Sequence, residues 1–295
     1  MTLRIGSVCT GYGGLDMAVQ QVFGGELAWV SDIDPGACQI IRHRMPGVPN
    51  LGDLTTTDWT QVEPVDIFCG GYPCQPFSLA GELKGTADDR HIWPFIARAL
   101  RVLRPRVAVF ENVANHLRIG FDTVLADLAS LGFDAEWSLV QADEIGAPHQ
   151  RRRLFVYATA TDTTDLRHHW SGRTRDGRHG PADHGLAPAD ANGSGRRPQQ
   201  RHIPAGEPDP AWGRFGPAVR RWAVEVGRPA PWATDDRGRL NPVFVEWMMG
   251  LPAGHVTDVP GLTRTAQLKA LGNRVVPQQA AAALRLLADR AEVAA

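Results

Sequence analysis

One cysteine in this sequence stands where a nucleophile could act on a bound ligand. Cys74 lies between two prolines in Pro73-Cys74-Gln75-Pro76, after an apolar run at 65–69 and Gly70-Gly71. The run predicts a buried strand that ends at the glycines. The cysteine then belongs to a stiff loop at the carboxyl end of a strand, where open α/β sheets bind ligands. A single cysteine is more often an inert buried thiol, but the neighbouring motifs favour a nucleophile.

Candidate acid–base and cationic groups lie at two further strand ends. Glu111 ends the apolar run Val107–Glu111, where partial burial would raise its pKa as a general acid or base requires. A plain surface glutamate is the alternative. Arg151 and Arg153 alternate at the entry to the run Leu154–Ala158, so a strand beginning there would direct both to the same side. A solvated basic edge is the alternative for the two arginines.

These groups need a scaffold, and the sequence from Leu3 to about Thr159 predicts one. Short apolar runs alternate with helical patterns there, and this βαβα order predicts an α/β fold with a mostly parallel sheet and helices on both faces. The predicted strands are Leu3–Cys9, Leu27–Ser31, Asp66–Cys69, Val107–Glu111, Ala135–Val140 and Leu154–Ala158. The predicted helices are Leu15–Phe23, Pro35–His43, Trp93–Leu103 and Phe121–Leu131.

The sequence changes in character after residue 159, which predicts three parts: a sheet domain at 1–159, a small, partly irregular region at 160–237, and a segment at 238–295 that returns to the sheet domain. Residues 161–202 contain seven arginines, five aspartates and five histidines but no lysine, and they have almost no apolar periodicity. This composition predicts a long loop or a disordered insert. Further helices are predicted at Pro217–Val226 and at Leu240–Gly250, which has Asn241-Pro242 as its N-cap and first-turn proline. A last helix is predicted to begin near Val276-Pro277 and to run through Gln278–Ala288.

The composition narrows the class of protein. The 295 residues are 43% hydrophobic with a net charge of −1, so a real core is expected and the charge alone does not indicate a nucleic-acid partner. The four cysteines form no CxxC pair or zinc-ligand spacing, so we expect no disulfide framework, no metal and a reducing compartment. The absence of a membrane-length apolar run or a signal-peptide pattern predicts a cytoplasmic protein.

The basic residues are unusual in kind. Two of the 31 basic residues are lysines and the others are arginines. The planar fork of arginine suits phosphates and guanine edges, and codon bias in a GC-rich genome is the alternative explanation for the total.

The first predicted strand leads into a turn that suits a cofactor. The glycines of Gly11-Tyr12-Gly13-Gly14 let the backbone approach a ligand at a helix N-terminus, although a plain tight turn is the alternative. Asp32 follows the second strand, where an acidic residue typically holds ribose hydroxyls. Asp53 is a third candidate, or a turn-stabilising aspartate. Because no GxGxxG spacing and no Walker-type lysine occur, a nucleoside cofactor without a pyrophosphate is favoured.

The order of these motifs resembles that of the C5-cytosine DNA methyltransferases over almost the whole chain. The matching segments are the glycine loop, Pro73-Cys74-Gln75, Glu111-Asn112-Val113, Gln150 to Arg153, the helix at 239–250 and Gly272-Asn273. The resemblance implies a Rossmann-like methyltransferase sheet, S-adenosylmethionine as methyl donor, and a cytosine flipped out of double-stranded DNA. It also implies that 160–237 is the target-recognition region of a monomer, with a cognate restriction endonuclease as a candidate partner.

The resemblance further implies roles for individual residues. Cys74 would attack C6 of the cytosine, Glu111 would protonate N3 or share its proton, and Arg153, with Arg151, would orient the base. The implied cofactor-binding residues are Cys9, Thr10, Gly11, Gly13, Gly14, Asp32, Ile33, Asp53, Leu54, Gly71, Pro73, Ile92, Trp93, Asn273 and Val275. The implied DNA-binding residues are Gln75, Ser78, Arg90, Arg220 and Arg221, with 78–90 as a loop that closes on DNA.

Two departures and three alternatives accompany the resemblance. Cys9 stands where the family usually has phenylalanine, and Ser7 lies where an acidic residue is usual. One alternative is a tRNA cytosine-5 methyltransferase of the same fold, whose Cys-Phe-Thr element this sequence lacks. Another is a non-catalytic DNA-binding relative, against which the intact motifs argue. The third is a cysteine hydrolase, which would need His149 as its base although the motif favours a loop residue.

Overall fold

A six-stranded sheet organises the protein, whose computed structural model describes residues 2–73, 92–161 and 212–293. The spatial order is β2-β1-β3-β4-β6-β5. The first four strands in this order run parallel, which confirms the predicted mostly parallel sheet, whereas β6 runs antiparallel to both of its neighbours. The strands are β1 (Arg4–Val8), β2 (Glu26–Ser31), β3 (Ile67–Gly70), β4 (Val107–Val113), β5 (Phe133–Val140) and β6 (Arg153–Ala160).

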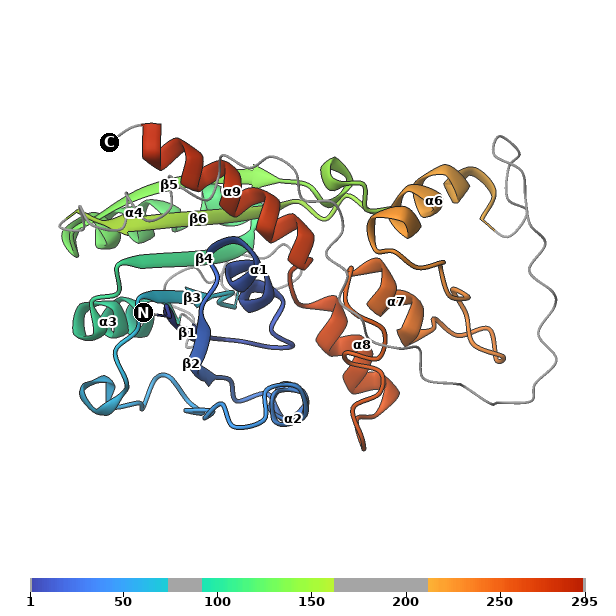
Figure 1. Ribbon diagram of the computed structural model, residues 1–295, viewed down its shortest axis with the longest axis horizontal. Coiled ribbons are helices and arrows are strands. Elements are labelled where there is room, and N and C mark those ends of the chain that lie inside the picture. The colour runs from blue at the N-terminus through green and yellow to red at the C-terminus, as the bar shows by residue number, and fades with distance from the viewer. Residues whose placement is uncertain (1, 74–91, 162–211, 294–295) are drawn as a thin grey trace.

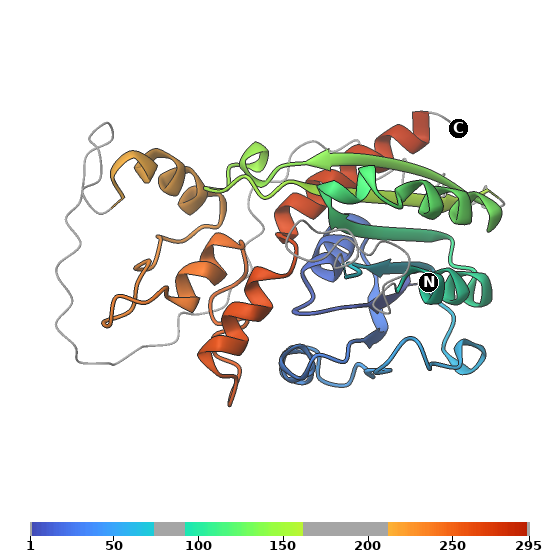
Figure 2. The same cartoon turned by 180° about the vertical axis from the view of Figure 1, so that it is seen from behind.

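Helices cover both faces of this sheet (Figure 1). α1 and α9 pack against one face, where Leu15 and Leu284 join Ile5 in one apolar cluster. α3 and α4 cover the other face, where Trp93 and Phe110 belong to a second cluster. Figure 2 shows both layers from behind. The helices of this part are α1 (Gly14–Phe23), α2 (Pro35–Arg44), α3 (Trp93–Leu103), α4 (Phe121–Ser130) and α9 (Pro277–Val293).

A smaller helical body lies beside the sheet (Figure 1). Its core contains Trp222 and Trp247, both 0% exposed, and extends to Tyr12 in the glycine loop. Val219 of α6 and Phe244 of α7 share this core, so residues on both sides of position 237 pack together. The helices are α6 (Gly216–Glu225), α7 (Pro242–Met248) and α8 (Arg264–Gly272), and short 3-10 helices occur at Trp59–Gln61, Ala114–Arg118, Ala142–Ile145 and Gly213–Phe215.

The sequence predicted most of these elements but not α8. The predicted cap of α7 is confirmed, because the Asn241 side chain accepts a hydrogen bond from the Val243 N–H and proline follows it. The segment 264–272 was assigned no element in the sequence analysis. It forms a helix in which Leu271 is the one buried residue, so it lacks the apolar stripe on which helix prediction depends. Among the helices of the described ranges, none combines the length and apolar character needed to cross a bilayer.

One buried carboxylate holds the helical body together. Glu246 of α7 is 0% exposed, and its two oxygens accept hydrogen bonds from the N–H groups of Gly254, Val256 and Thr257 at 2.8, 2.5 and 3.0 Å. The Thr257 hydroxyl donates a fourth bond at 3.0 Å. These bonds fix the loop that follows α7, and His255 of this loop donates from Nε2 to the Tyr12 carbonyl at 2.8 Å. The helical body is thereby attached to the glycine loop.

We expect Glu246→Gln to lower the free energy of unfolding by about 3 kcal/mol, because the new amide would turn an NH₂ group toward buried backbone donors. Urea unfolding followed by tryptophan fluorescence measures the change. Glu225→Gln on exposed α6 surface is the matched control and should change stability by less than about 0.5 kcal/mol. Equal stabilities of the two variants would contradict the role given to Glu246.

Candidate active site

The loops that follow the parallel strands meet at one edge of the sheet, and the first of them is the glycine loop. It follows Val8 and contains three residues with positive φ, Cys9 at 53°, Gly11 at 64° and Gly13 at 84°. The Tyr12 hydroxyl donates to the carbonyl of Val275 at 2.6 Å. The predicted glycine turn before α1 is therefore present. The segment that follows α8 packs against it.

A pocket of about 360 Å³ opens beside this loop. That volume lies within the range of roughly 300–1,000 Å³ found for small-molecule sites. The pocket lies where β1 and β2 end, with further walls from the loops at 52–54 and 73 and from the start of α3. The lining residues are Cys9, Ser31, Asp32, Ile33, Asp34, Gly52, Asp53, Leu54, Pro73, Ile92 and Arg274.

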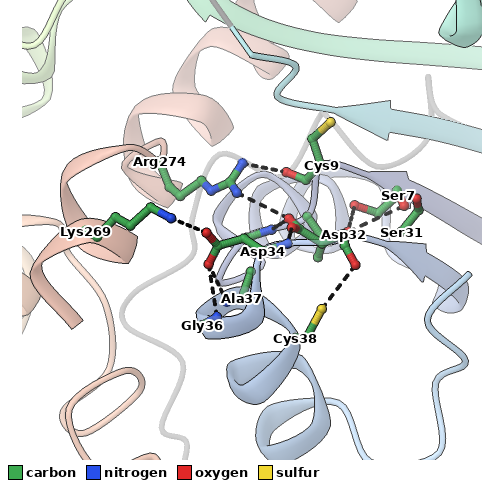
Figure 3. Close-up of polar contacts among 12 residues, drawn as sticks. Ser7, Cys9, Ser31, Asp32, Asp34, Gly36, Ala37, Cys38, Lys269 and Arg274 are labelled. Atoms are coloured by element: carbon green, nitrogen blue, oxygen red, sulfur yellow. Dashed lines mark hydrogen bonds and ion pairs between the residues drawn. The ribbon is translucent and has the colours of Figure 1, made fainter. Parts of the chain in front are cut away.

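The Asp32 side chain joins the glycine loop, the loop after β2 and Arg274 (Figure 3). Its Oδ2 accepts hydrogen bonds from the Gly11 N–H at 2.8 Å and from Arg274 Nη2 at 3.2 Å, and its Oδ1 accepts from the Asp34 N–H at 2.9 Å. The Asp32 side chain is 5% exposed, whereas the Arg274 side chain is 22% exposed. The predicted carboxylate after the second strand is therefore in the pocket, with an arginine that the sequence analysis did not assign.

A second ion pair lies at the pocket rim. Lys269 of α8 pairs with Asp34, whose side chain also accepts from the Gly36 and Ala37 N–H groups at 3.0 and 3.2 Å and so caps α2. The two ion pairs in Figure 3 both join the segment around the end of α8 to the loop after β2. The rim is thus assembled from residues more than two hundred positions apart in the chain.

The remaining walls of the pocket contain further predicted cofactor-binding residues, among them Asp53 and Cys9. Asp53 lines the pocket and also accepts from the Thr55 N–H at 2.9 Å, so the turn-stabilising interpretation of this aspartate holds as well. The Ser31 hydroxyl donates to the Gly52 carbonyl at 2.7 Å and fixes this loop. Burial raises the pKa of the Cys9 thiol to about 12, so that the pocket wall is neutral at this point.

Glu111 and Arg153 form the second feature of this edge. Because β6 is antiparallel to β4, Arg153 pairs with Val113 and lies diagonally from Glu111. Arg153 Nε and Glu111 Oε1 are 2.8 Å apart, with side chains 18% and 11% exposed. Burial raises the pKa of Glu111, and the charge of Arg153 opposes this rise. A Cβ on Gly71 would lie 3.1 Å from Glu111 Oε2, so the glycine before the nucleophile motif lets the carboxylate approach.

The expectation that Arg151 and Arg153 point to the same side of a strand is wrong. β6 begins at Arg153, and Arg151 has φ of 26°, outside the extended conformation that alternation requires. Its Nη1 and Nη2 donate to the Gly272 carbonyl at 3.2 and 3.1 Å, and Nη2 also donates to the Arg274 carbonyl. Arg151 therefore holds the segment that follows α8, while Arg153 contacts the carboxylate.

The strand end before the nucleophile motif is anchored. The Tyr72 hydroxyl donates to His116 Nε2 at 2.8 Å, and His116 Nδ1 donates to the Ile119 carbonyl at 2.9 Å. The Asn112 amide donates to the Tyr72 carbonyl at 3.5 Å. The predicted Cys74, Gln75, Ser78 and Arg90, and the loop at 78–90, lie outside the described residues.

Several predicted site residues lie near the pocket without lining it. Trp93 is 1% exposed and donates from Nε1 to Asp127 at 2.8 Å, so it belongs to the core below. Asn273 is an exposed C-cap of α8, and its neighbour Arg274 is the residue that reaches the pocket. Arg220 and Arg221 are exposed on α6, away from the residues that line the pocket, and their predicted contact with DNA stays a prediction. The other predicted cofactor-binding residues lie in or directly beside the loops around the pocket: Thr10, Gly11, Gly13, Gly14, Gly71 and Val275.

The pairing of Arg274 with Asp32 spans 242 positions, so no local sequence pattern predicts it. The one local signal is that Arg274 directly follows the Gly272-Asn273 motif. Ser31, Asp34 and Gly52 line the pocket without an assigned role. His149, the base that a cysteine hydrolase would need, donates from Nε2 to the Met248 carbonyl at 3.1 Å, and burial lowers its pKa.

Comparisons with known proteins agree with this geometry. Residues 3–179 match the model of the family described as C-5 cytosine-specific DNA methylase. The type II methyltransferase M.NlaX of Neisseria lactamica is 32% identical over 172 residues, 56% of this chain and 54% of that protein. M.NgoBV of Neisseria gonorrhoeae is 29% identical over 153 residues, 48% of this chain and 36% of that protein. The matched part thus spans between about a third and a half of these relatives' own length.

Solved structures extend the similarity to the whole fold. The Dnmt2 methyltransferase of S. pombe superposes with a TM-score of 0.64 at 15% identity, covering 98% of this chain and 99% of that one. The Entamoeba histolytica methyltransferase EhMeth gives 0.63 at 14% identity, with 99% of both chains covered. At such identities the likeness concerns the fold, and the family model carries the assignment. Since that model covers the glycine loop, Asp32, Glu111 and Arg153, the chain belongs to the C-5 cytosine-specific DNA methylase family.

Proposed function

We propose that this chain is a DNA (cytosine-5-)-methyltransferase that transfers a methyl group from S-adenosylmethionine to C5 of a flipped cytosine in a specific duplex sequence. The observation that carries the proposal is the buried Glu111–Arg153 pair at 2.8 Å. It lies against Gly71, three residues before Cys74, at the strand edge that also holds the pocket. An acid, an arginine and a cysteine motif beside a nucleoside-sized pocket suit methylation of a cytosine.

The pocket residues fit the proposed cofactor. S-adenosylmethionine carries a ribose, a sulfonium and an ammonium group, and bound there it supplies an electrophilic methyl group. Asp32 offers a carboxylate suited to ribose hydroxyls. Asp34 and Asp53 add negative charge to the pocket wall, which favours a ligand with cationic groups. Leu54 and Ile92 add apolar surface on which an adenine ring can lie.

The proposed chemistry divides the work among three side chains. The Cys74 thiolate adds to C6 of the cytosine, and Glu111 donates a proton to N3, so that charge does not build on the ring. Arg153 keeps Glu111 in place and orients the base. C5 becomes nucleophilic and takes the methyl group, with S-adenosylhomocysteine as the leaving group. Loss of the C5 proton, departure of the Cys74 thiolate and return of the N3 proton to Glu111 then restore the aromatic ring.

We also propose the partners that this activity requires. Double-stranded DNA is the substrate, and 160–237 chooses the target. The exposure of Arg220 and Arg221 on α6 supports their role in contacting DNA. The type II names of the bacterial relatives support the proposal of a cognate endonuclease as a partner. We further propose that the enzyme works as a monomer in the bacterial cytoplasm.

We expect Cys74→Ala to abolish methyl transfer while S-adenosylhomocysteine binding stays within about twofold, because in the proposed mechanism the thiol bonds to the cytosine and not to the cofactor. Bisulfite sequencing of plasmid DNA from expressing cells measures the activity. The wild-type protein should also be trapped on DNA that carries 5-fluorocytosine, since fluorine cannot leave as a proton does. Full methylation by the variant would remove Cys74 from the mechanism.

We expect Glu111→Gln to slow single-turnover methylation by about 10²–10⁴-fold, the range for loss of a general acid. Burial raises the pKa of Glu111 in the folded protein, so its protonated, acidic form is present below that pKa and is lost as pH rises through it. The wild-type rate should therefore fall on the alkaline side, and the glutamine variant should lack this limb. A variant that keeps the same alkaline limb would assign it to another group.

We expect Asp32→Asn to weaken S-adenosylhomocysteine binding by about 1–3 kcal/mol, the range for lost charged hydrogen bonds. Isothermal titration calorimetry measures the cofactor, and DNA affinity without cofactor should hardly change. Asp122→Asn removes an equal charge from an exposed position of α4 and serves as the control. An unchanged titration of the Asp32 variant would exclude this residue from the cofactor site.

A further inference from the structure

We infer that Arg274 recognises the carboxylate at the amino-acid end of the cofactor, because its guanidinium lies in the pocket between the glycine loop and Asp32. The pocket is then selective for ligands that carry such a carboxylate. This inference rests on the proposed function, which assigns the pocket to S-adenosylmethionine. It adds a residue that selects among adenosyl ligands.

The charges of the pocket lining suit a ligand that carries an anionic group beside its cationic groups. Among the described residues of the lining, Asp32, Asp34 and Asp53 are acidic and Arg274 is the one basic residue. The acids suit the sulfonium and ammonium groups of S-adenosylmethionine, whereas an arginine at the same pocket repels them. The arginine is complementary to the third charged group of this ligand, its carboxylate, which the guanidinium fork binds well.

The guanidinium has donors left for a ligand. Nη1 donates to the Cys9 carbonyl at 2.9 Å, and Nη2 donates to Asp32 Oδ2 at 3.2 Å. These bonds use two of the five N–H donors of an arginine, and the other three have no partner among residues 2–73, 92–161 and 212–293. The side chain is 22% exposed, so it reaches the pocket surface rather than ending in the core. A ligand carboxylate can therefore bind to it without breaking either bond.

The glycine loop is shaped around this arginine. A Cβ on Gly11 would lie 2.2 Å from Arg274 Nε, so any larger residue there would displace the guanidinium. The positive φ of Gly11, 64°, likewise favours glycine. The arginine thus lies directly on the turn between β1 and α1.

A purely structural role explains Arg274 less well, because its segment is already held by other residues. Arg151 donates to the carbonyls of Gly272 and Arg274, and the Tyr12 hydroxyl donates to the carbonyl of Val275 at 2.6 Å. These bonds fix the backbone on both sides of the arginine. Its side chain is therefore not needed to keep the segment in place, and its position at the pocket calls for another role.

The test compares two ligands that differ only in the carboxylate, S-adenosylmethionine and its decarboxylated form, by calorimetric titration of the full chain without DNA. We expect the wild-type protein to prefer S-adenosylmethionine by about 10- to 100-fold, the equivalent of a charged hydrogen bond. Arg274→Gln should weaken S-adenosylmethionine by that factor, should change the decarboxylated ligand less than about twofold, and should so abolish the preference.

Lys269→Met is the matched control. It removes one positive charge and one ion pair from the same segment, and Lys269 does not line the pocket, so the wild-type preference should persist. Equal weakening of both ligands by Arg274→Gln would make Arg274 a structural residue and overturn the inference, as would a wild-type protein without preference. In both cases the proposed cofactor stands. If the wild-type protein binds neither ligand, the proposed cofactor fails together with the inference.

Discussion

The close approach of the glycine loop to the segment after α8 is the constraint on which the site depends. A Cβ on Gly14 would lie 2.7 Å from the Val275 carbonyl oxygen, and one on Gly11 would meet Arg274 at 2.2 Å. The two segments lie in contact only because neither position carries a side chain. The packing of α9 on α1, β5 and β6 brings the far end of the chain to this place. The pocket is therefore a product of both ends of the sequence.

The direction of β6 decides which side chain lies beside Glu111 at the end of β4. If β6 ran parallel to β4, its first residue would lie at the opposite edge of the sheet from the end of β4. The antiparallel pairing of Val113 with Arg153 places the arginine beside Glu111. Each of these half-buried charges would be costly without the other, because removal of one leaves an unpaired charge in a poorly solvated position. The strand direction thus determines which charge acts on the ionisation of the Glu111 carboxylate.

The sequence distance between interacting residues explains which features could be predicted from the sequence and which could not. Apolar periodicity and local caps predicted β1, α1 and α7, since Asn241 and its partner Val243 are two residues apart. Glycine spacing predicted the turn at 11–14, because this turn also depends on residues that are close together in the sequence. α8 lacks an apolar stripe, and Arg274 meets Asp32 across 242 positions, so no local pattern contains that information. Arg151 was misplaced because alternation holds only inside a strand, and its φ of 26° puts it outside.

Asp32 has to serve both the protein and a ligand, and its two oxygens divide these tasks. Oδ2 accepts hydrogen bonds from Gly11 and Arg274, whereas Oδ1 accepts, within the described part of the chain, one hydrogen bond from the Asp34 N–H. A carboxylate oxygen can accept a second donor, so Oδ1 retains capacity for a hydroxyl group. The Gly11 and Asp34 N–H groups hold the Asp32 carboxylate in place before any ligand binds. A ligand then adds to an oriented carboxylate, and less ordering opposes its binding than if the carboxylate were free to rotate.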